Sequence, residues 1–415
     1  MSSCAAELRA FKDDHPPLMG LAALMTMAYS GVDLAPLGKF MVERATLDES
    51  DANALMDLSV ILQLRGDSDV AMDIQTQALA LQQAYSLPAV TDGPGVRLLA
   101  VKGPGEIMWN TPLEFLVQGS DVTLEMLYVS PDQPLPKVVP DHDVMFIAVS
   151  ESDQNHALLD QIGDYIRHWP RPVFNMPDRI TRVSRDNAWS ILDRIDGVVM
   201  PVCARVDRTC LALAGRAEAT AVASLIGDAG FPLLVRPVDS QAGRGLAKID
   251  GSGAVLDYLD ARPEHEFYVS PYVDYRGQDG LFRKYRIVFI DGHPYICHVA
   301  ISEHWMVHYL NAGMTESAAK RAEEAWCMDD FDAGFASRHG RALREINSRV
   351  GLDYFAIDCA ETKDGALLIF EVGNAMVVHA MDSMDDFSYK QAHMQKVFDA
   401  FRTMLTKVVG REQTP

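Results

Sequence analysis

The sequence has few cysteines and no long apolar run. Six cysteines occur among 415 residues, and none forms a Cys-x-x-Cys pair, which is typical of free thiols in a reducing compartment. No segment reaches the roughly 18 apolar residues of a membrane span. The short apolar stretch 16–29 follows Lys12-Asp13-Asp14 rather than the basic start of a signal peptide. We therefore expect a cytoplasmic protein.

Basic residues are also scarce. Lys and Arg number 37 against 58 Asp and Glu, which gives a formal net charge of −21. Because nucleic acids and anionic membranes both attract basic surfaces, this balance argues against either as a partner. Hydrophobic residues make up 48% and charged residues 23% of the chain, an ordinary globular composition for two or three domains.

Residues 1–90 show helical periodicity and no strand-like alternation. Apolar residues recur at three- and four-residue spacing in segments 18–29, 37–45, 52–64 and 71–85. The stretch 51–83 resembles one tetratricopeptide repeat, a helix pair of about 34 residues. Two interpretations stay open for this helical arm: a docking surface for a peptide or protein, or a plain helical hairpin packed on the next domain.

An α/β pattern follows a linker at 88–95. Apolar runs predict strands at 96–101, 124–129, 144–149 and 172–175, with helices at 112–118, capped by Asn110 or Thr111, and at 154–168. This alternation predicts a mainly parallel sheet covered on both faces. Gly103-Pro-Gly105 follows the first strand, but Met108 replaces the third glycine of a dinucleotide fingerprint, so we expect only a tight turn.

After residue 180 the pattern becomes α+β. We expect helices at 184–194, 217–229, 333–350 and 388–408, and strands at 233–236, 246–249, 267–273, 285–290, 293–301, 355–359 and 366–371. The last two strands flank Lys363-Asp364-Gly365, which predicts a hairpin turn.

Three groups of residues suit phosphate chemistry. Arg236 ends an apolar strand before Ser240-Gln-Ala-Gly-Arg-Gly245, where small residues let backbone N–H groups approach phosphate oxygens. Asp358 and Glu371 end adjacent apolar strands, and a hard cation such as Mg²⁺ prefers such oxygen ligands. Lys284 and Arg286 share one strand face and can stabilise transferring phosphoryl groups. Each group also has a purely structural interpretation. The loop at 240–245 suits a hairpin with a glycine turn, Asp358 and Glu371 suit an exposed salt-bridged pair, and Lys284 and Arg286 suit a solvated strand end.

In order along the chain, these motifs resemble the ATP-grasp superfamily, nearest the glutathione synthetase and ribosomal-protein glutamyl ligase branch. The resemblance covers about residues 96–408 and rests on Asn175-Met-Pro-Asp-Arg-Ile180, 232–245, Tyr268-Val-Ser-Pro-Tyr-Val273, 285–292, 351–358 and Phe370-Glu-Val-Gly-Asn374. It implies an α+β ATP-grasp domain at 179–412, with two lobes meeting near residue 273. An α/β pre-ATP-grasp domain at 93–178 and the all-α tetratricopeptide-like arm at 1–90 would precede it.

The resemblance implies an ATP- and Mg²⁺-dependent carboxylate–amine ligase that forms an acyl phosphate, with Mn²⁺ as an alternative ion. Lys284 and Arg286 would be catalytic, and Asp358, Glu371 and Asn374 would bind the metal. The residues implied for ATP are Arg185, Arg236, Ser240, Gln241, Gly243, Arg244, Gly245, Pro271, Tyr272 and Val273.

Two departures from the family leave a second interpretation open. No lysine occurs between Val138 and Ala247, where this branch holds ATP with two lysines, and Gly373 replaces a usual asparagine ligand. An inactive, nucleotide-binding regulatory protein would tolerate both changes.

Several aromatic and imidazole side chains follow the strand that borders the acceptor site. His298, His304, Trp305 and His308 suit substrate recognition, core packing or, for the histidines, a zinc site. His379, with Asp382 close by in the sequence, suits either a base near the incoming amine in the substrate site or a structural histidine. The arm favours a peptide or protein substrate, a free amino acid is the alternative, and a homodimer is compatible with both.

Overall fold

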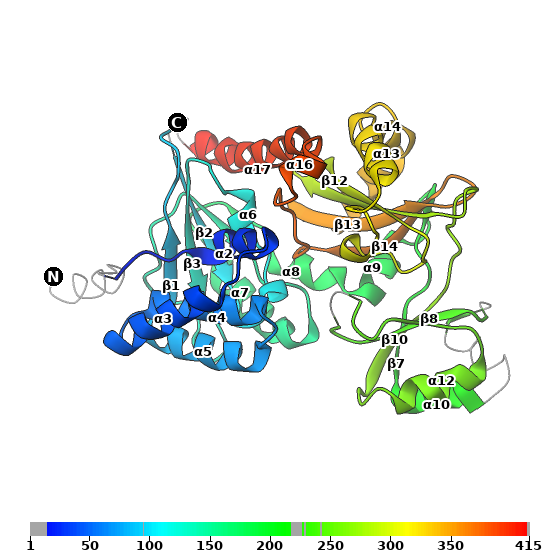
Figure 1. Cartoon of the computed structure of the whole chain (residues 1–415), viewed down its shortest axis with the longest axis horizontal. Coiled ribbons are helices and arrows are strands. Elements are labelled where there is room, and N and C mark those ends of the chain that lie inside the picture. The colour runs from blue at the N-terminus through cyan, green and yellow to red at the C-terminus, as the bar shows by residue number, and fades with distance from the viewer. Residues whose placement is uncertain (1–14, 94, 217–225, 228–229, 241–242, 413–415) are drawn as a thin grey trace.

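The computed structural model describes residues 15–93, 95–216, 226–227, 230–240 and 243–412. Figure 1 shows the arm helices beside a first sheet, a second sheet under the C-terminal helix, and a smaller lobe at the far end. Within these residues, no helix is long and apolar enough to cross a membrane.

Four helices form the arm: α2 (Gly20–Tyr29), α3 (Ala35–Leu47), α4 (Ala52–Leu64) and α5 (Ser68–Leu81). Asp51 caps α4 by accepting a hydrogen bond from the backbone N–H of Ala54. The helix expected to run to Tyr85 ends at Leu81, and Ala84–Leu87 form strand β1 instead. The buried Tyr85 donates its hydroxyl to the Ala78 carbonyl. The arm is therefore not helical as far as residue 90.

Strand β1 joins a sheet with the order β1-β3-β2-β4-β5, in which only β1 is antiparallel. The other strands are β2 (Val96–Lys102), β3 (Val122–Tyr128), β4 (Val144–Ile147) and β5 (Val173–Phe174). Leu99 and Val101 share a core with α7 (His156–Ile166), whereas Leu98 and Ala100 share one with α17 (Lys390–Glu412). The prediction of a mainly parallel sheet covered on both faces is confirmed.

The loop after β2 is held by side chains expected to cap the next helix, α6 (Leu113–Leu116). Asn110 exchanges two hydrogen bonds with the backbone of Gly103, and Thr111 donates to the Asn374 carbonyl, so neither caps α6. A Cβ on Gly105, which has φ +139°, would lie 2.1 Å from the Trp109 ring. Only glycine fits that turn.

The smaller lobe is an antiparallel sheet with the order β7-β10-β8-β9. Its strands are β7 (Ala204–Asp207), β8 (Leu233–Pro237), β9 (Ala247–Ile249) and β10 (Glu266–Pro271), with helices α10 (Arg208–Arg216) and α12 (Ser252–Asp260). The helix predicted at 217–229 lies outside the described residues except for 226 and 227.

The larger sheet has the order β12-β11-β13-β14-β6. Its strands are β6 (Val198–Val199), β11 (Phe282–Ile290), β12 (His293–Ser302), β13 (Tyr354–Glu361) and β14 (Leu367–Gly373). The β13–β14 pair is the predicted hairpin. The other helices in this part are α8 (Pro177–Ile180), α9 (Arg185–Leu192), α13 (Ala318–Asp329), α14 (Phe335–Arg338), α15 (Gly340–Val350) and α16 (Met384–Phe387). The single helix expected at 333–350 is thus two helices that break at His339.

Candidate functional site

A cavity of about 760 Å³ lies where the sheet of the smaller lobe, the larger sheet, the α/β domain and α2 meet. Most side chains singled out in the sequence line it: Arg185, Arg236, Ser240, Gly243, Pro271, Tyr272, Val273, Lys284, Arg286, His298, Trp305, His308, Asp358, Glu371, Asn374 and His379. Arg244, Gly245 and His304 are not among its lining residues, and Gln241 lies outside the described residues.

Four of these side chains form one row across the larger sheet. His298 on β12 pairs with Arg286 on β11, Arg286 pairs with Asp358 on β13, and Asp358 pairs with Glu371 on β14. Directly paired residues point to the same face of a sheet. The register shifts immediately after Arg286 and again after Asp358. Such bulges change the direction in which nearby side chains point, and one bulge lies on each side of the row.

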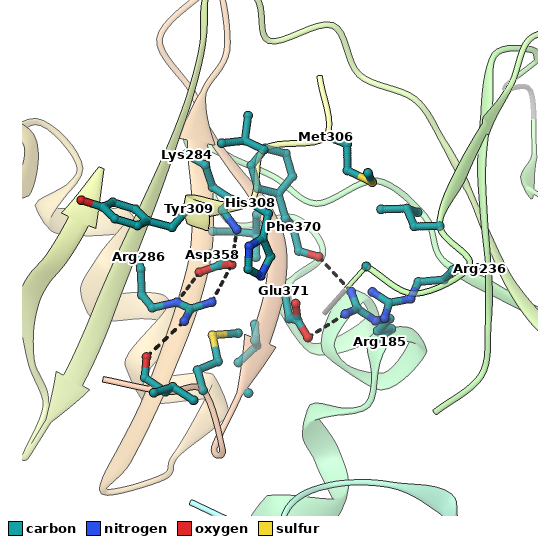
Figure 2. A pocket seen from close by; sticks show the side chains of 18 of the residues that line it. Arg185, Arg236, Lys284, Arg286, Met306, His308, Tyr309, Asp358, Phe370 and Glu371 are labelled. Carbon is teal, nitrogen blue, oxygen red and sulfur yellow. Dashed lines mark hydrogen bonds and ion pairs between the residues drawn. The ribbon is translucent and has the colours of Figure 1, made fainter. Parts of the chain in front are cut away.

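Asp358 holds two cations at the centre of the row (Figure 2). Its Oδ2 lies 2.8 Å from Lys284 Nζ, and its Oδ1 lies 2.8 Å from Arg286 Nε. Burial alone would raise the pKa of Asp358, but the charges and hydrogen bonds of Arg286 and Lys284 outweigh burial and hold that pKa well below its usual range. The cluster keeps one excess positive charge beside the cavity and can attract an anion.

A second pair of cations faces Glu371. Arg185 Nη2 lies 2.6 Å from Glu371 Oε1, and Figure 2 shows Arg236 beside Arg185. Burial and the charge of Arg185 lower the pKa of Arg236 to about 10. Two guanidinium groups near one carboxylate again leave a positive excess, and guanidinium forks suit phosphate oxygens. The predicted substitution of arginines for lysines therefore brings two cations to one wall of the cavity.

The loop after β8 leads from Arg236 to the cavity. Arg236 Nε donates to Ser240 Oγ at 3.1 Å, and its Nη2 donates to the Ser240 carbonyl. Gly245 has φ +70°, and a Cβ there would lie 2.7 Å from Pro237 Cδ, so a side chain would be strained and crowded. Arg244 is largely exposed and reaches Glu106 in the α/β domain, with 3.4 Å between Nη2 and Oε2, instead of lining the cavity.

The segment 271–273 forms an aromatic corner. The backbone N–H of Tyr272 donates to the Pro232 carbonyl at 3.0 Å. Lys248 Nζ lies 5.0 Å from the centre of the Tyr272 ring, and the Trp305 ring packs edge-on against Tyr272 at 5.9 Å. A flat heterocycle can stack in such a corner.

The predicted histidines separate into distinct roles. His298 Nε2 is buried and has no hydrogen-bond partner within the described residues, and burial followed by the charge of Arg286 lowers the His298 pKa well below its usual value. His308 caps the short turn at Tyr309–Asn311 by accepting from the Leu310 N–H. His304 is exposed, so its predicted contact with substrate finds no support in the geometry.

Asn374 joins two domains. Its Nδ2 donates to the Val149 carbonyl at 2.9 Å, and its Oδ1 accepts from the Glu151 N–H at 3.2 Å. Both polar atoms of the amide are thereby engaged, which argues against its expected role as a metal ligand. In the described part of the chain, no group of three or more His, Cys, Asp or Glu side chains converges as a metal site.

The sequence interpretation pointed to Asp382 beside His379, but it missed other polar residues that line the cavity, among them Tyr29, Glu151 and Lys390. Glu151 follows β4, and ligand crevices of parallel sheets lie beyond the carboxyl ends of strands, so this position could have been found. Burial raises the pKa of Glu151 to about 7. Tyr29 and Lys390 carried no such signal, since only the folding of distant segments brings them to the cavity.

No family model and no curated protein matches the chain. Among solved structures, it is similar to D-alanine–D-alanine ligase from Bacillus anthracis complexed with ATP, at 15% identity and a TM-score of 0.45 over 76% of this chain and 99% of that one. A RimK domain protein ATP-grasp from Sphaerobacter thermophilus aligns at 15% identity and a TM-score of 0.39 over 75% and 99%. The VanG D-Ala:D-Ser ligase from Enterococcus faecalis aligns at 11% identity and a TM-score of 0.44 over 75% and 99%. At these TM-scores, none of the three similarities supports an argument about function.

Proposed function

We propose that the chain is an ATP-grasp ligase that joins a carboxylate to an amine at the expense of ATP. The observation that supports this most is the gathering of two carboxylates and four cations in one cavity between the two β-sheets of this part of the chain: Asp358 is ion-paired with Lys284 and Arg286, and Glu371 is ion-paired with Arg185 and feels the charge of Arg236. Each cluster has one positive charge more than its carboxylate neutralises, which suits a polyphosphate.

The two clusters have different roles in this proposal. Arg185 and Arg236 hold the phosphates, and the aromatic corner at Tyr272 holds the base. Substrate carboxylate oxygen attacks the γ-phosphorus, the bond to ADP breaks, and an acyl phosphate results. Lys284 and Arg286 stabilise its charge. The amine nitrogen then bonds to the acyl carbon, phosphate leaves, and the amine loses a proton.

The residues fit a magnesium ion shared with nucleotide phosphates. Such ions usually take one or two protein carboxylates and keep several waters. Glu371 is 34% exposed at the cavity and is ion-paired with Arg185, so a bound ion would share this carboxylate with that guanidinium. Asp358 stands directly opposite as the second ligand. Such an ion supplies charge neutralisation between the phosphates.

A turnover assay tests the proposal. The protein is incubated with ATP, magnesium, and panels of amino acids and peptides as carboxylate and amine donors, and products are followed by phosphate release and mass spectrometry. We expect ligation by the wild type and none by Glu371→Gln, and a cooperative unfolding transition at a somewhat lower midpoint shows that this variant is folded despite the lost ion pair with Arg185. Exposed Glu49→Gln is the matched control. Normal turnover by Glu371→Gln would contradict the assignment of the metal carboxylate.

The same geometry favours one alternative, a nucleotide-binding protein without turnover. Both oxygens of Asp358 are already paired with Lys284 and Arg286, and the Asn374 amide is engaged elsewhere. A magnesium ion would then depend on Glu371 alone among the three predicted ligands. A wild type that binds ATP but ligates none of the panel would support this alternative.

A further inference from the structure

Helix α2 of the arm closes one end of the cavity. Met25 and Tyr29 line it from α2, and His379, Met381 and Asp382 line it from the segment after β14. Met25 and Met381 also belong to a shared apolar cluster around Phe115, together with Val377. The arm is therefore a wall of the cavity, which the tetratricopeptide resemblance does not indicate.

This end borders the cationic row. Arg286, which bonds Asp358, also donates from Nη1 to the Val377 carbonyl at 3.1 Å. Residues 377–382 thus start beside Arg286, whereas Arg185 lies at Glu371, two strands away in the row. A second substrate placed here would approach the acyl group from the side opposite the nucleotide.

The polar groups at this end favour a cation. Asp382 Oδ2 accepts from Lys390 Nζ at 2.8 Å, and Lys390 Nζ also lies 3.5 Å from the fully buried Glu324. Two carboxylates therefore share one ammonium group. Among the residues that the structure describes, Asp382 Oδ1 has a single, long contact of 3.3 Å from the Tyr29 hydroxyl, and it can accept a stronger donor from a ligand.

The remaining wall is apolar or neutral. Tyr29 and His379 rings lie 5.7 Å apart, and an ammonium group is attracted to such aromatic faces. Burial lowers the pKa of His379 to about 4, so this imidazole carries no charge at neutral pH. The flexible thioethers of Met25 and Met381 adapt to apolar groups of varied shape.

We propose that the end of the cavity between α2 and residues 377–382 binds the amine substrate, with its ammonium group on Asp382 beside Tyr29 and its apolar portion against Met25 and Met381. This inference deepens the proposed ligase function and rests on it for the fate of the amine. In this proposal, the arm helps to select the amine substrate, because Met25 and Tyr29 of α2 contact it in the cavity.

The test uses hexylamine as the probe, with hexanol as the uncharged comparator, in calorimetric titrations of the full chain. We expect hexylamine to bind the wild type more tightly than hexanol does. Asp382→Asn should weaken hexylamine by about tenfold or more, since it removes a charge-assisted contact. Met25→Trp, which fills the site without changing charge, should weaken both probes. Val32→Trp is the control, because Val32 is 46% exposed beyond the end of α2.

The affinity for ATP is measured in the same samples. We expect every variant to bind ATP as the wild type does. Equal binding of hexylamine and hexanol, or unchanged hexylamine binding in both Asp382→Asn and Met25→Trp, would overturn the amine site. A wild type that binds hexylamine in the expected pattern but does not bind ATP would instead refute the ligase proposal and keep the amine site.

Discussion

At the scale of single residues, the cavity has more cationic side chains than carboxylates to pair with them. Asp358 takes two cations, and Glu371 faces two more. A cationic excess of this kind beside buried carboxylates costs stability until an anion arrives, because buried charges are expensive without a partner. Ligand binding and folding stability should therefore be coupled at this site.

Glu151 allows a pH test at the same scale. Burial raises its pKa from 4.5 to about 7, so between those pH values the folded chain binds more protons at Glu151 than the unfolded chain. The stabilising contribution is complete below the lower value and is lost as pH rises through the upper one. Because glutamine does not titrate, the free energy of unfolding of Glu151→Gln should fall less between about pH 5 and about pH 8 than that of the wild type. At about pH 8 the variant should therefore be more stable than the wild type, by at most about 3 kcal/mol.

Urea unfolding midpoints at about pH 5 and about pH 8 measure that difference. Exposed Glu49→Gln is the control and should follow the wild type. A Glu151→Gln variant that loses stability with pH as steeply as the wild type would show that another group titrates.

At the scale of elements, two asparagines hold the α/β domain against the larger sheet. Asn175 donates to the Tyr354 carbonyl at 2.8 Å and accepts from the Tyr354 N–H at 2.9 Å, at the start of β13. Asn374 makes the equivalent connection after β14. These contacts fix the row of site residues on β13 and β14 relative to the end of β4.

Removing the Asn374 side chain should therefore destabilise the whole protein. Asn374→Ala leaves the Val149 carbonyl and the Glu151 N–H unpaired, at a cost of about 2–3 kcal/mol. Exposed Asn187→Ala, which loses only a 3.3 Å contact to Thr181, should cost under about 1 kcal/mol. Chemical denaturation compares the two variants. Equal costs would mean that the Asn374 bridge contributes nothing beyond a surface contact.

Local signals explain which elements the sequence predicted. The β13–β14 hairpin was predictable, because two apolar runs flank a turn sequence and the spacing places Asp358 opposite Glu371. Strand β1 was missed, because its four residues continue the apolar spacing of α5 and only pairing with β3 makes them a strand. The apposition of Tyr29 and Asp382 depends on residues 353 positions apart, and no local pattern reports such contacts.

At the scale of the whole molecule, the helical arm shares a hydrophobic core with the α/β domain and the C-terminal helix. Leu18, Met56 and Leu79 belong to the same core cluster as Leu98 of β2 and Phe401 of α17. Gln75 also exchanges two hydrogen bonds with the backbone of Gly105 in the α/β domain. These contacts favour the packed-hairpin interpretation of the arm over a free docking repeat.

Deleting residues 1–83 should accordingly prevent folding, not merely weaken substrate binding. The deletion exposes apolar residues of the first sheet to water and removes one wall of the cavity. Soluble yield and thermal unfolding of the truncated chain measure the effect, and full-length Phe40→Ala, at a side chain that is 53% exposed, should behave as the wild type. A soluble truncated protein with normal affinity for ATP would show that the arm is a separate module.

The measurement that tests the central claim most directly is a calorimetric titration of Mg·ATP into the wild type, Arg236→Ala and the control Arg194→Ala, whose side chain is 91% exposed. A lost charge-assisted contact to phosphate is worth about 1.5–3 kcal/mol, so Arg236→Ala should weaken ATP by about tenfold or more. Arg194→Ala should bind as the wild type does. No binding of Mg·ATP to the wild type, or equal affinity in all three proteins, would contradict a nucleotide site between Arg236 and Glu371.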